Sequence, residues 1–275
     1  MAAFGFRVLA SGSRANVTLV VTESSRVLID CGLSARETAR RLVEAGIDPN
    51  SIDALVVTHE HSDHVRGIRV FAKQFKLPVY ASEDTIGASG ELQEVAGDQL
   101  RFFSSGEDFG IGNLSFSPFS IPHDAVDPVG FKITGHGKSF VIATDLGHVT
   151  QLVRERIAGA SALLLEANHD LDLLHNAPYP WELKQRIRGR LGHLSNDAAR
   201  ELLADSVAAS GWTPQVVIAG HISENSNEPW RAVAALRDGL SQASAHVEVA
   251  ASSFGAPTAY YELTQERESR ALVNE

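Results

Sequence analysis

One short stretch, His59–His64 (HEHSDH), places three histidines and an aspartate, all common metal ligands, within six residues. It directly follows Ala54–Thr58, an apolar run with the length and composition of a strand. A loop that leaves a strand in this way gathers imidazoles and a carboxylate around one point. Imidazole nitrogen suits zinc, iron and nickel, and a carboxylate tolerates harder ions, so the stretch predicts a metal site. As a merely solvated loop, this density of His and Asp would have no structural purpose.

The composition is that of an ordinary globular protein, with 44% hydrophobic and 21% charged residues among 275, enough for one large core or two small domains. We expect no signal peptide, because Met1–Arg7 lacks a basic start and no apolar stretch approaches ~18 residues. The single cysteine, Cys31, excludes an internal disulfide framework and favours a reducing, cytoplasmic location. A formal charge of -10 argues against a broad sequence-independent grip on nucleic acid, although a local basic groove is compatible with it.

Apolar runs and helical patterns alternate along the chain without a repeat or a linker. Strands are predicted at Phe6–Ser11, Asn16–Thr22, Arg26–Cys31, Ala54–Thr58, Pro78–Ala81, Leu100–Phe103, Leu114–Ile121, Gly130–Ile133, Ser139–Thr144, Ala162–Glu166, Gln215–Ala219, Val247–Ala251 and Tyr260–Leu263, the last two closing the sheet. Helices are predicted at Ala35–Ala45, from the metal loop to Phe75, and at Trp181–Arg190, Asn196–Ala209 and Pro229–Gln242. Two strand-rich halves, each with its own helices, predict a layered α/β fold of two packed sheets covered by helices. We expect one domain over residues 1–264 and a polar tail over 265–275.

Several predicted strands end in His or Asp. The residues at these ends are Asp30, His123, Asp145 and His221. Functional residues collect at strand ends because the loops there are free to converge. Taken singly, each has a plain explanation, such as a solvated histidine or a turn aspartate. Together with the His59–His64 loop, they indicate a single site.

This set of motifs, in this order and over essentially the whole chain, resembles the metallo-β-lactamase superfamily. The resemblance implies a four-layer αββα sandwich with a two-metal site at the edges of the sheets. Carried over by motif position, it implies these ligands: His59, His61 and His123 for one metal, Asp63, His64 and His221 for the second, and Asp145 bridging both. It makes Asp30 a buried carboxylate that orients a ligand.

The implied chemistry is hydrolysis. Two divalent ions a few ångström apart would lower the pKa of a shared water from ~15.7 towards neutrality and so give a hydroxide nucleophile. We expect Asp63 both to bind metal and to orient this hydroxide. Zinc is the expected metal, and manganese or iron also suit a set of histidine and carboxylate ligands without thiolate.

Two later segments resemble the nuclease branch of the superfamily. Gly192–Ser195 (GHLS) is similar to an element whose histidine sits over the scissile phosphate, and Leu165–Asp170 (LEANHD) is similar to the segment upstream of it. We expect His193 and Glu166 to supply the leaving-group proton. The alternatives are a residue at a helix N-terminus for His193 and a buried or turn-paired acid for Glu166.

The densest basic cluster of this acidic chain lies immediately before His193. It consists of Lys184, Arg186, Arg188 and Arg190. A solvated helix face is the default interpretation, yet one or two of these side chains are expected to point towards the site and hold phosphates. The candidates for substrate binding are Lys184 and Arg188, together with Ser13 and Asn168.

Four segments together resemble the bacterial YycJ/WalJ group of nuclease-like proteins. They are Ser11–Asn16, Thr144–Gly147, Glu166–Asp170 and His221–Asn227. The departure from the group is Ala15, where a glycine is usual. Because alanine does not adopt a positive φ cheaply, we expect the loop at Arg14-Ala15 to differ in shape.

Three functional hypotheses follow. The first is a metal-dependent phosphodiesterase that acts on DNA or RNA as an exonuclease on single strands or ends, for which the resemblance implies 5′-to-3′ degradation of DNA. The second, favoured by the acidic net charge, is a hydrolase of a small ester, thioester, lactone or cyclic phosphodiester. The third is a catalytically silent scaffold, against which the complete set of ligands argues.

Overall fold

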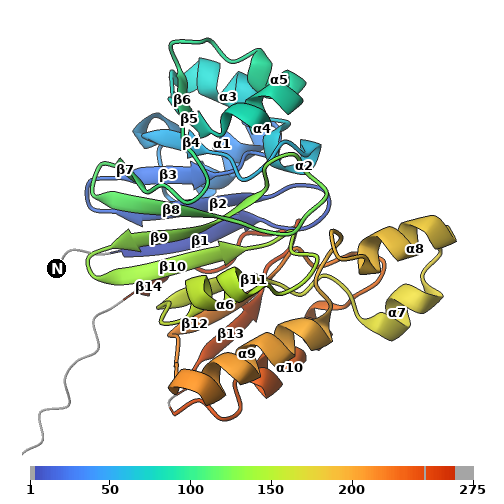
Figure 1. The fold of residues 1–275 in the computed structure, drawn as a ribbon. Coiled ribbons are helices and arrows are strands. Elements are labelled where there is room, and N and C mark those ends of the chain that lie inside the picture. Colours follow the sequence, from blue (N-terminus) through green and yellow to red (C-terminus); the bar gives the residue numbers. More distant parts are fainter. Residues whose placement is uncertain (1–3, 245, 264–275) are drawn as a thin grey trace, which may run out of the picture.

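The structure is a computed structural model that describes residues 4–244 and 246–263, so the polar tail predicted over 265–275 lies outside the described residues. Two seven-stranded sheets pack face to face, and helices cover both outer faces (Figure 1). The predicted αββα sandwich is therefore confirmed. Within the described residues, no helix combines the length and apolar character needed to cross a membrane.

Each sheet is mixed, with a run of parallel strands on one side. The first has the order β14-β1-β2-β3-β4-β5-β6 and contains β1 (Phe4–Ala10), β2 (Val17–Thr22), β3 (Arg26–Ile29), β4 (Ala54–Val56), β5 (Val79–Ala81), β6 (Leu100–Phe102) and β14 (Tyr261–Leu263). The second has the order β13-β12-β11-β10-β9-β8-β7 and contains β7 (Phe109–Ile111), β8 (Leu114–Ser120), β9 (Val129–Gly135), β10 (Lys138–Ala143), β11 (Ala162–Glu166), β12 (Val216–Gly220) and β13 (Glu248–Ala251). Strands β3 to β6 are parallel to one another, as are β10 to β13.

The helices form the two outer layers and one projection. They are α1 (Ala35–Glu44), α2 (Ser62–Val65), α3 (Ile68–Phe75), α4 (Glu83–Ala88), α5 (Gly90–Gln93), α6 (Gln151–Ile157), α7 (Leu171–Asn176), α8 (Trp181–Arg188), α9 (Asn196–Ser210) and α10 (Pro229–Gly239), with a 3₁₀ turn, η1 (Pro49–Ser51). In Figure 1, α1, α3, α4 and α5 lie over the first sheet, α6, α9 and α10 lie over the second, and α7 and α8 project from the sandwich.

The strand periodicity explains why each sheet is covered on both faces. Side chains alternate between faces along a strand. On β1, Phe6 and Val8 enter the core between the sheets, whereas Leu9 enters the core beneath the helices of the first layer. Phe6 stacks on Phe140 of the opposing sheet with a centroid distance of 3.9 Å. Strands buried on both faces read as continuous apolar runs, which is why the sequence reveals them.

The prediction that the last two strands close one sheet is wrong. Strand β13 pairs with β12 at the edge of the second sheet, while β14 returns to the first sheet and pairs antiparallel with β1, with Phe4 opposite Leu263. An alternating apolar pattern identifies a strand without specifying its partner. Most predicted boundaries agree to within three residues, and α4, α5, α6, α7 and β7 were not predicted because such short elements show little periodicity.

The helix predicted to run through to Phe75 is interrupted at Gly67. A Cβ on Gly67 would lie 2.0 Å from the Leu33 carbonyl oxygen, and the Gly67 N–H donates to the Cys31 carbonyl. The close approach of this neighbouring segment therefore separates α2, which carries part of the predicted metal motif, from α3.

We expect Arg41→Met to lower the free energy of unfolding by about 2–3 kcal/mol, because it removes a charged donor from buried acceptors. The buried Arg41 guanidinium on α1 donates to the carbonyls of Leu9 (2.7 Å) and Phe254 (2.9 Å). Urea denaturation measures the effect. The matched control is Arg40→Met on the same helix, whose exposed ion pairs should contribute less than about 1 kcal/mol.

Candidate metal centre

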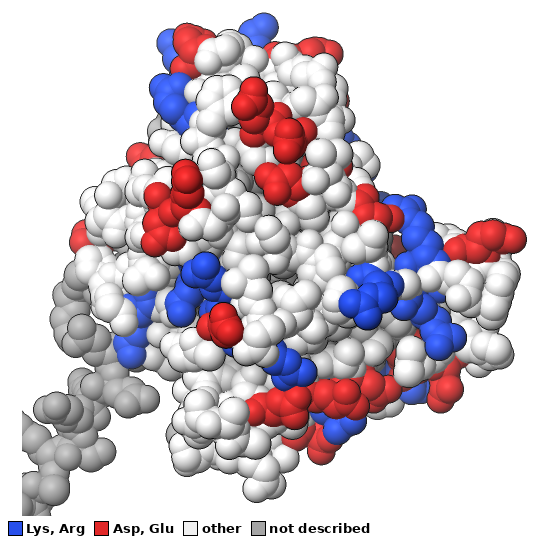
Figure 2. Space-filling model, viewed as in Figure 1, with Lys and Arg blue, Asp and Glu red and all other residues white. Residues whose placement is uncertain are grey.

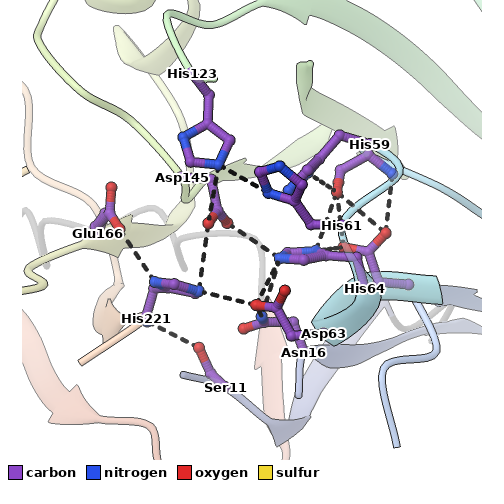
Figure 3. Close-up of polar contacts among 12 residues, drawn as sticks. Ser11, Asn16, His59, His61, Asp63, His64, His123, Asp145, Glu166 and His221 are labelled. Atoms are coloured by element: carbon purple, nitrogen blue, oxygen red, sulfur yellow. Dashed lines mark hydrogen bonds and ion pairs between the residues drawn. The ribbon is translucent and has the colours of Figure 1, made fainter. Parts of the chain in front are cut away.

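The site lies where the carboxyl ends of the parallel strands meet, at the edge of the sandwich. Figure 3 shows side chains from α2 (Ser62–Val65) and from the loops after β4, β8, β10 and β12 converging there with a residue from the end of β11. Loops at this end of parallel strands are a general location for ligand sites. The sandwich brings two such ends together, one from each sheet, so residues distant in the sequence become neighbours.

Three residues at these strand ends have left-handed backbone conformations. The φ angles of Asp30, Asp145 and His221 are 60°, 59° and 49°. Each such conformation costs about 1–3 kcal/mol and persists only where the surroundings enforce it. Backbone hydrogen bonds supply part of that restraint, because Asp30 N–H donates to the Val56 carbonyl and His221 N–H donates to Ser11 Oγ. The loops therefore hold these side chains in positions that an ordinary strand exit does not provide.

Three histidines form one half of the centre. Ligand-capable atoms of His59, His61 and His123 all lie within 4.8 Å of one another. His59 Nδ1 lies 3.0 Å from Thr58 Oγ1, and His123 Nδ1 donates to the Gly192 carbonyl at 3.1 Å. These contacts leave Nε2 of His59 and His123 for the centre, and the buried Nε2 of His59 has no hydrogen-bond partner. His61 differs, because its Nδ1 is the atom that lies 3.2 Å from His123 Nε2.

The second half combines Asp63, His64 and His221, whose ligand-capable atoms also lie within 4.8 Å of one another. Each imidazole is held through Nδ1 by a buried carboxylate: His64 by Asp30 at 2.8 Å and His221 by Glu166 at 3.2 Å. Their Nε2 atoms both lie 3.4 Å from Asp63 Oδ2. Carboxylates behind imidazoles in this way orient the ring and raise its basicity towards a metal.

Asp145 lies between the two halves (Figure 3). Its Oδ1 is 3.3 Å from His221 Nε2 and 3.8 Å from His123 Nε2, and its Oδ2 is 3.4 Å from His64 Nε2. The buried Oδ2 has no hydrogen-bond partner. A buried, unsatisfied carboxylate oxygen surrounded by imidazoles fits a position between two cations.

The electrostatics show that the centre favours positive charge. Burial lowers the pKa of His59 well below its ordinary value, and the neighbouring His64 adds to this effect. Burial opposes ionisation of Asp145, yet the charges of His221 and His64 outweigh it and hold the Asp145 pKa well below its ordinary value. The pKa of His64 is raised well above its ordinary value, because Asp30 and Asp145 overcome the effect of burial. The carboxylates thus create a strongly negative centre, and the donor set fits divalent metal ions.

Glu166 lies behind His193 rather than at the cavity. It is fully buried and accepts hydrogen bonds from His193 Nδ1 (2.8 Å), Leu146 N–H (2.6 Å) and Leu194 N–H (3.1 Å). Burial opposes its ionisation, but the His193 charge and hydrogen bond, with those of His221, lower its pKa to about 2. Glu166 is therefore a carboxylate at neutral pH. It contacts His193 Nδ1 and, at 3.2 Å, His221 Nδ1, so it can act on a substrate through both imidazoles. Its predicted role as a source of the leaving-group proton stays a prediction.

A cavity of about 240 Å³ opens over the centre. It is lined by Ser13, His61, Ser62, Asp63, His123, Asp124, Asp145, Leu183, Arg186, Ile187, Gly192, His193 and His221. Of the four predicted substrate-binding residues, only Ser13 is among them. Lys184 instead donates to the His175 carbonyl, and Asn168 is buried and donates to the His221 carbonyl. Arg188 does not line the cavity either, since the helical turn directs Leu183, Arg186 and Ile187 to it.

The loop at Ser11–Asn16 contributes a residue that the sequence analysis did not assign. Asn16 Nδ2 lies 3.2 Å from Asp63 Oδ2 and 3.0 Å from His64 Nε2, and Asn16 Oδ1 accepts from Gly12 N–H. The positive φ of this turn is at Gly12 (133°), and Ala15 is a fully buried core residue with an ordinary φ. Ala15 therefore does not need the positive φ that alanine adopts only at a cost.

A family model described as "Beta-lactamase superfamily domain" matches residues 25–222. The chain belongs to the metallo-β-lactamase superfamily, in agreement with its fold and its His- and Asp-rich centre, which indicates divalent metal binding.

Within this superfamily the chain is similar to two bacterial exodeoxyribonucleases. It is 36% identical over 227 residues to exodeoxyribonuclease WalJ of Streptococcus pneumoniae (serotype 2, strain D39), a match that covers 82% of this chain and 83% of the relative. It is 35% identical over 223 residues to exodeoxyribonuclease YycJ of Bacillus anthracis, covering 81% and 83%. The metallo-β-lactamase fold protein YhfI of Bacillus subtilis shares the fold, with a TM-score of 0.70, 16% identity and coverage of 93% and 99%. The predicted resemblance to the YycJ/WalJ group is confirmed.

We expect Asp30→Asn to weaken divalent metal binding by about 10- to 100-fold, since the carboxylate that holds His64 becomes an uncharged amide. Competition with a chromophoric chelator measures the affinity. The control is Asp53→Asn, which removes a carboxylate that accepts from the Arg26 N–H at the opposite end of β3 and should leave metal affinity unaltered. Equal affinities in all three proteins would contradict this role for Asp30.

Proposed function

We propose that this protein is a metal-dependent nuclease, an exonuclease that hydrolyses phosphodiester bonds of DNA with two divalent metal ions. The observation that carries the proposal is the pair of ligand groups joined by Asp145, with His193 beside them at the same cavity. The similarity to two exodeoxyribonucleases over more than four fifths of the chain supports the same class of reaction.

The ligands proposed are those that the geometry groups together. One ion would be held by His59, His61 and His123, the other by Asp63, His64 and His221, and Asp145 would bridge them. Such a pair of ions supplies an activated water and neutralises negative charge on a phosphodiester. We propose zinc as the metal because most donors are imidazoles, with manganese or iron as the alternatives.

Two residues at the cavity would act on the substrate. Asp63, on α2, is only partly buried and lines the cavity, so it is placed to orient the attacking water as well as to bind metal. His193 Nδ1 donates a hydrogen bond to the Glu166 carboxylate, which leaves Nε2 as the nitrogen available to a substrate. A histidine with this arrangement can donate a proton to the departing oxygen, while Glu166 keeps the ring positioned.

The substrate is proposed to be a single strand or a strand end. The cavity is smaller than the roughly 300–1,000 Å³ typical of sites that enclose a drug-sized ligand, so it admits only a small part of a polymer. A cytoplasmic location would follow from a nucleic acid substrate. The same small volume and the acidic net charge keep a hydrolase of small esters or cyclic phosphodiesters as the second candidate.

The test is hydrolysis of 5′- and 3′-end-labelled DNA and RNA oligonucleotides with zinc and then with manganese. We expect stepwise shortening of DNA by the wild type. For Asp145→Ala we expect the rate to fall by at least about 100-fold, because loss of a ligand should exceed the roughly 10- to 100-fold effect typical of removing a residue that only supports a ligand. Asp205→Ala, at an exposed ion pair, is the control. Intact oligonucleotides with metal demonstrably bound would reject the nuclease in favour of the small-ester hydrolase.

We expect His193→Ala to lower kcat on DNA by about 10²- to 10⁴-fold with bound metal unchanged, because a proton donor is lost while the ligands remain. The loss should be much smaller on a phosphodiester with a p-nitrophenolate leaving group, which departs without protonation. Comparison of kcat for the two substrates measures the difference. An equal loss on both would mean that His193 has a role other than proton donation.

A further inference from the structure

A projecting pair of helices forms one wall of the cavity. Residues 171–190, which we call the arm, contain α7 and α8 and stand out from the sandwich (Figure 1). Among the residues of α8, none is buried, so the helix is not there to complete the core. Its inner side nevertheless lines the cavity through Leu183, Arg186 and Ile187. A helix with little core contact that borders an active site is well placed to contact a substrate.

The arm also differs from the rest of the chain in charge. It contains four Lys or Arg and two Asp or Glu residues, in a chain whose formal charge is -10. Figure 2 shows Lys and Arg side chains gathered where Figure 1 places α8. This local excess of positive charge is complementary to a phosphate backbone.

Within this cluster, Arg186 is the side chain that lines the cavity. Lys184 donates to the His175 carbonyl, and Arg190 contacts His148 Nε2 at 3.0 Å. Arg186 Nε donates to Asp124 Oδ2 at 2.6 Å, while the other oxygen of Asp124 lies 3.5 Å from His123 Nε2. Arg186 is thus held by a carboxylate beside the metal centre, through a bond that leaves its terminal amino groups for another acceptor.

We propose that Arg186 binds a phosphate of the substrate strand next to the one at the metal centre, and that this phosphate takes the place of Asp124. The proposal rests on the proposed nuclease function and assigns the residue that selects a polyanionic strand. Guanidinium groups bind phosphate with two parallel hydrogen bonds, which offsets the loss of the single bond to Asp124. Asp124 holds Arg186 beside the cavity until a phosphate replaces it. Because the Asp124 carboxylate competes with that phosphate, removal of its charge should strengthen binding of the strand.

The test compares Arg186→Ala with a control of the same charge change. The Arg186 side chain is 63% exposed, so the substitution leaves the core intact. Arg154→Ala is the control. Arg154, on α6, forms a similar exposed ion pair with Asp205 on α9 (2.9 Å), and Arg154 does not line the cavity. We expect Arg186→Ala to raise KM for a single-stranded oligonucleotide at least about tenfold, with kcat changed much less.

Two further readouts separate phosphate binding from a structural effect. The slope of log KM against log salt should become shallower by about 0.7 for the lost phosphate contact in Arg186→Ala and stay at the wild-type value in Arg154→Ala. Asp124→Asn should lower KM at low salt. Loss of bound metal from Arg186→Ala, or an unchanged KM and slope, would overturn the proposal, as would a higher KM for Asp124→Asn.

A separate measurement distinguishes failure of this inference from failure of the proposed function. Fluorescence anisotropy with a labelled single-stranded oligonucleotide reports binding by the holoenzyme whether or not cleavage occurs. Binding that weakens in Arg186→Ala but not in Arg154→Ala supports the phosphate contact even if no strand is cut. Cleavage by the wild type with identical binding by both variants would retain the nuclease and reject the role of Arg186.

Discussion

The buried negative charge of Asp145 is the constraint around which this edge of the molecule is arranged. Its carboxylate lies within 3.3–3.8 Å of ring nitrogens of His221, His64 and His123, which come from helix α2 and two separate loops. A buried carboxylate is costly unless cations or hydrogen bonds compensate for it. Compensation by imidazoles from both sheets links the two halves of the sandwich, and the same arrangement gives metal ions their ligands.

A layer of supporting hydrogen bonds decides which nitrogen of each ring faces the centre. Four histidines of the centre are buried, and each has its Nδ1 atom in contact with a supporting group: Thr58 for His59, Asp30 for His64, Glu166 for His221 and the Gly192 carbonyl for His123. With Nδ1 engaged, Nε2 is left for the centre in every case. The imidazoles are thus positioned by contacts on the side away from the centre, which leaves the cavity side of the centre open to a substrate.

The sequence was sufficient to predict two packed sheets and one His- and Asp-rich site, because apolar strands with polar residues at their ends are visible in a single chain. The assignment of the seven candidate ligands came from the resemblance to the superfamily. It was insufficient where three-dimensional packing decides. Arg186 and Lys184 are two residues apart on one helix, and only the docking of α8 determines that Arg186 borders the cavity. Similarly, the burial of Glu166 and the return of β14 to the first sheet depend on partners distant along the chain.

The pairing of Phe4 with Leu263 has a consequence for synthesis of the protein. At about 5–20 residues per second, the ribosome exposes β1 for roughly ten seconds or longer before its β14 partner exists. An unpaired strand edge can recruit strands from other chains. His221, which completes the second group of ligands, also emerges late, so a nascent chain should acquire its full affinity for two metal ions only near the end of translation. Metal uptake would then mark a chain whose two sheets have docked, which couples cofactor loading to the final stage of folding.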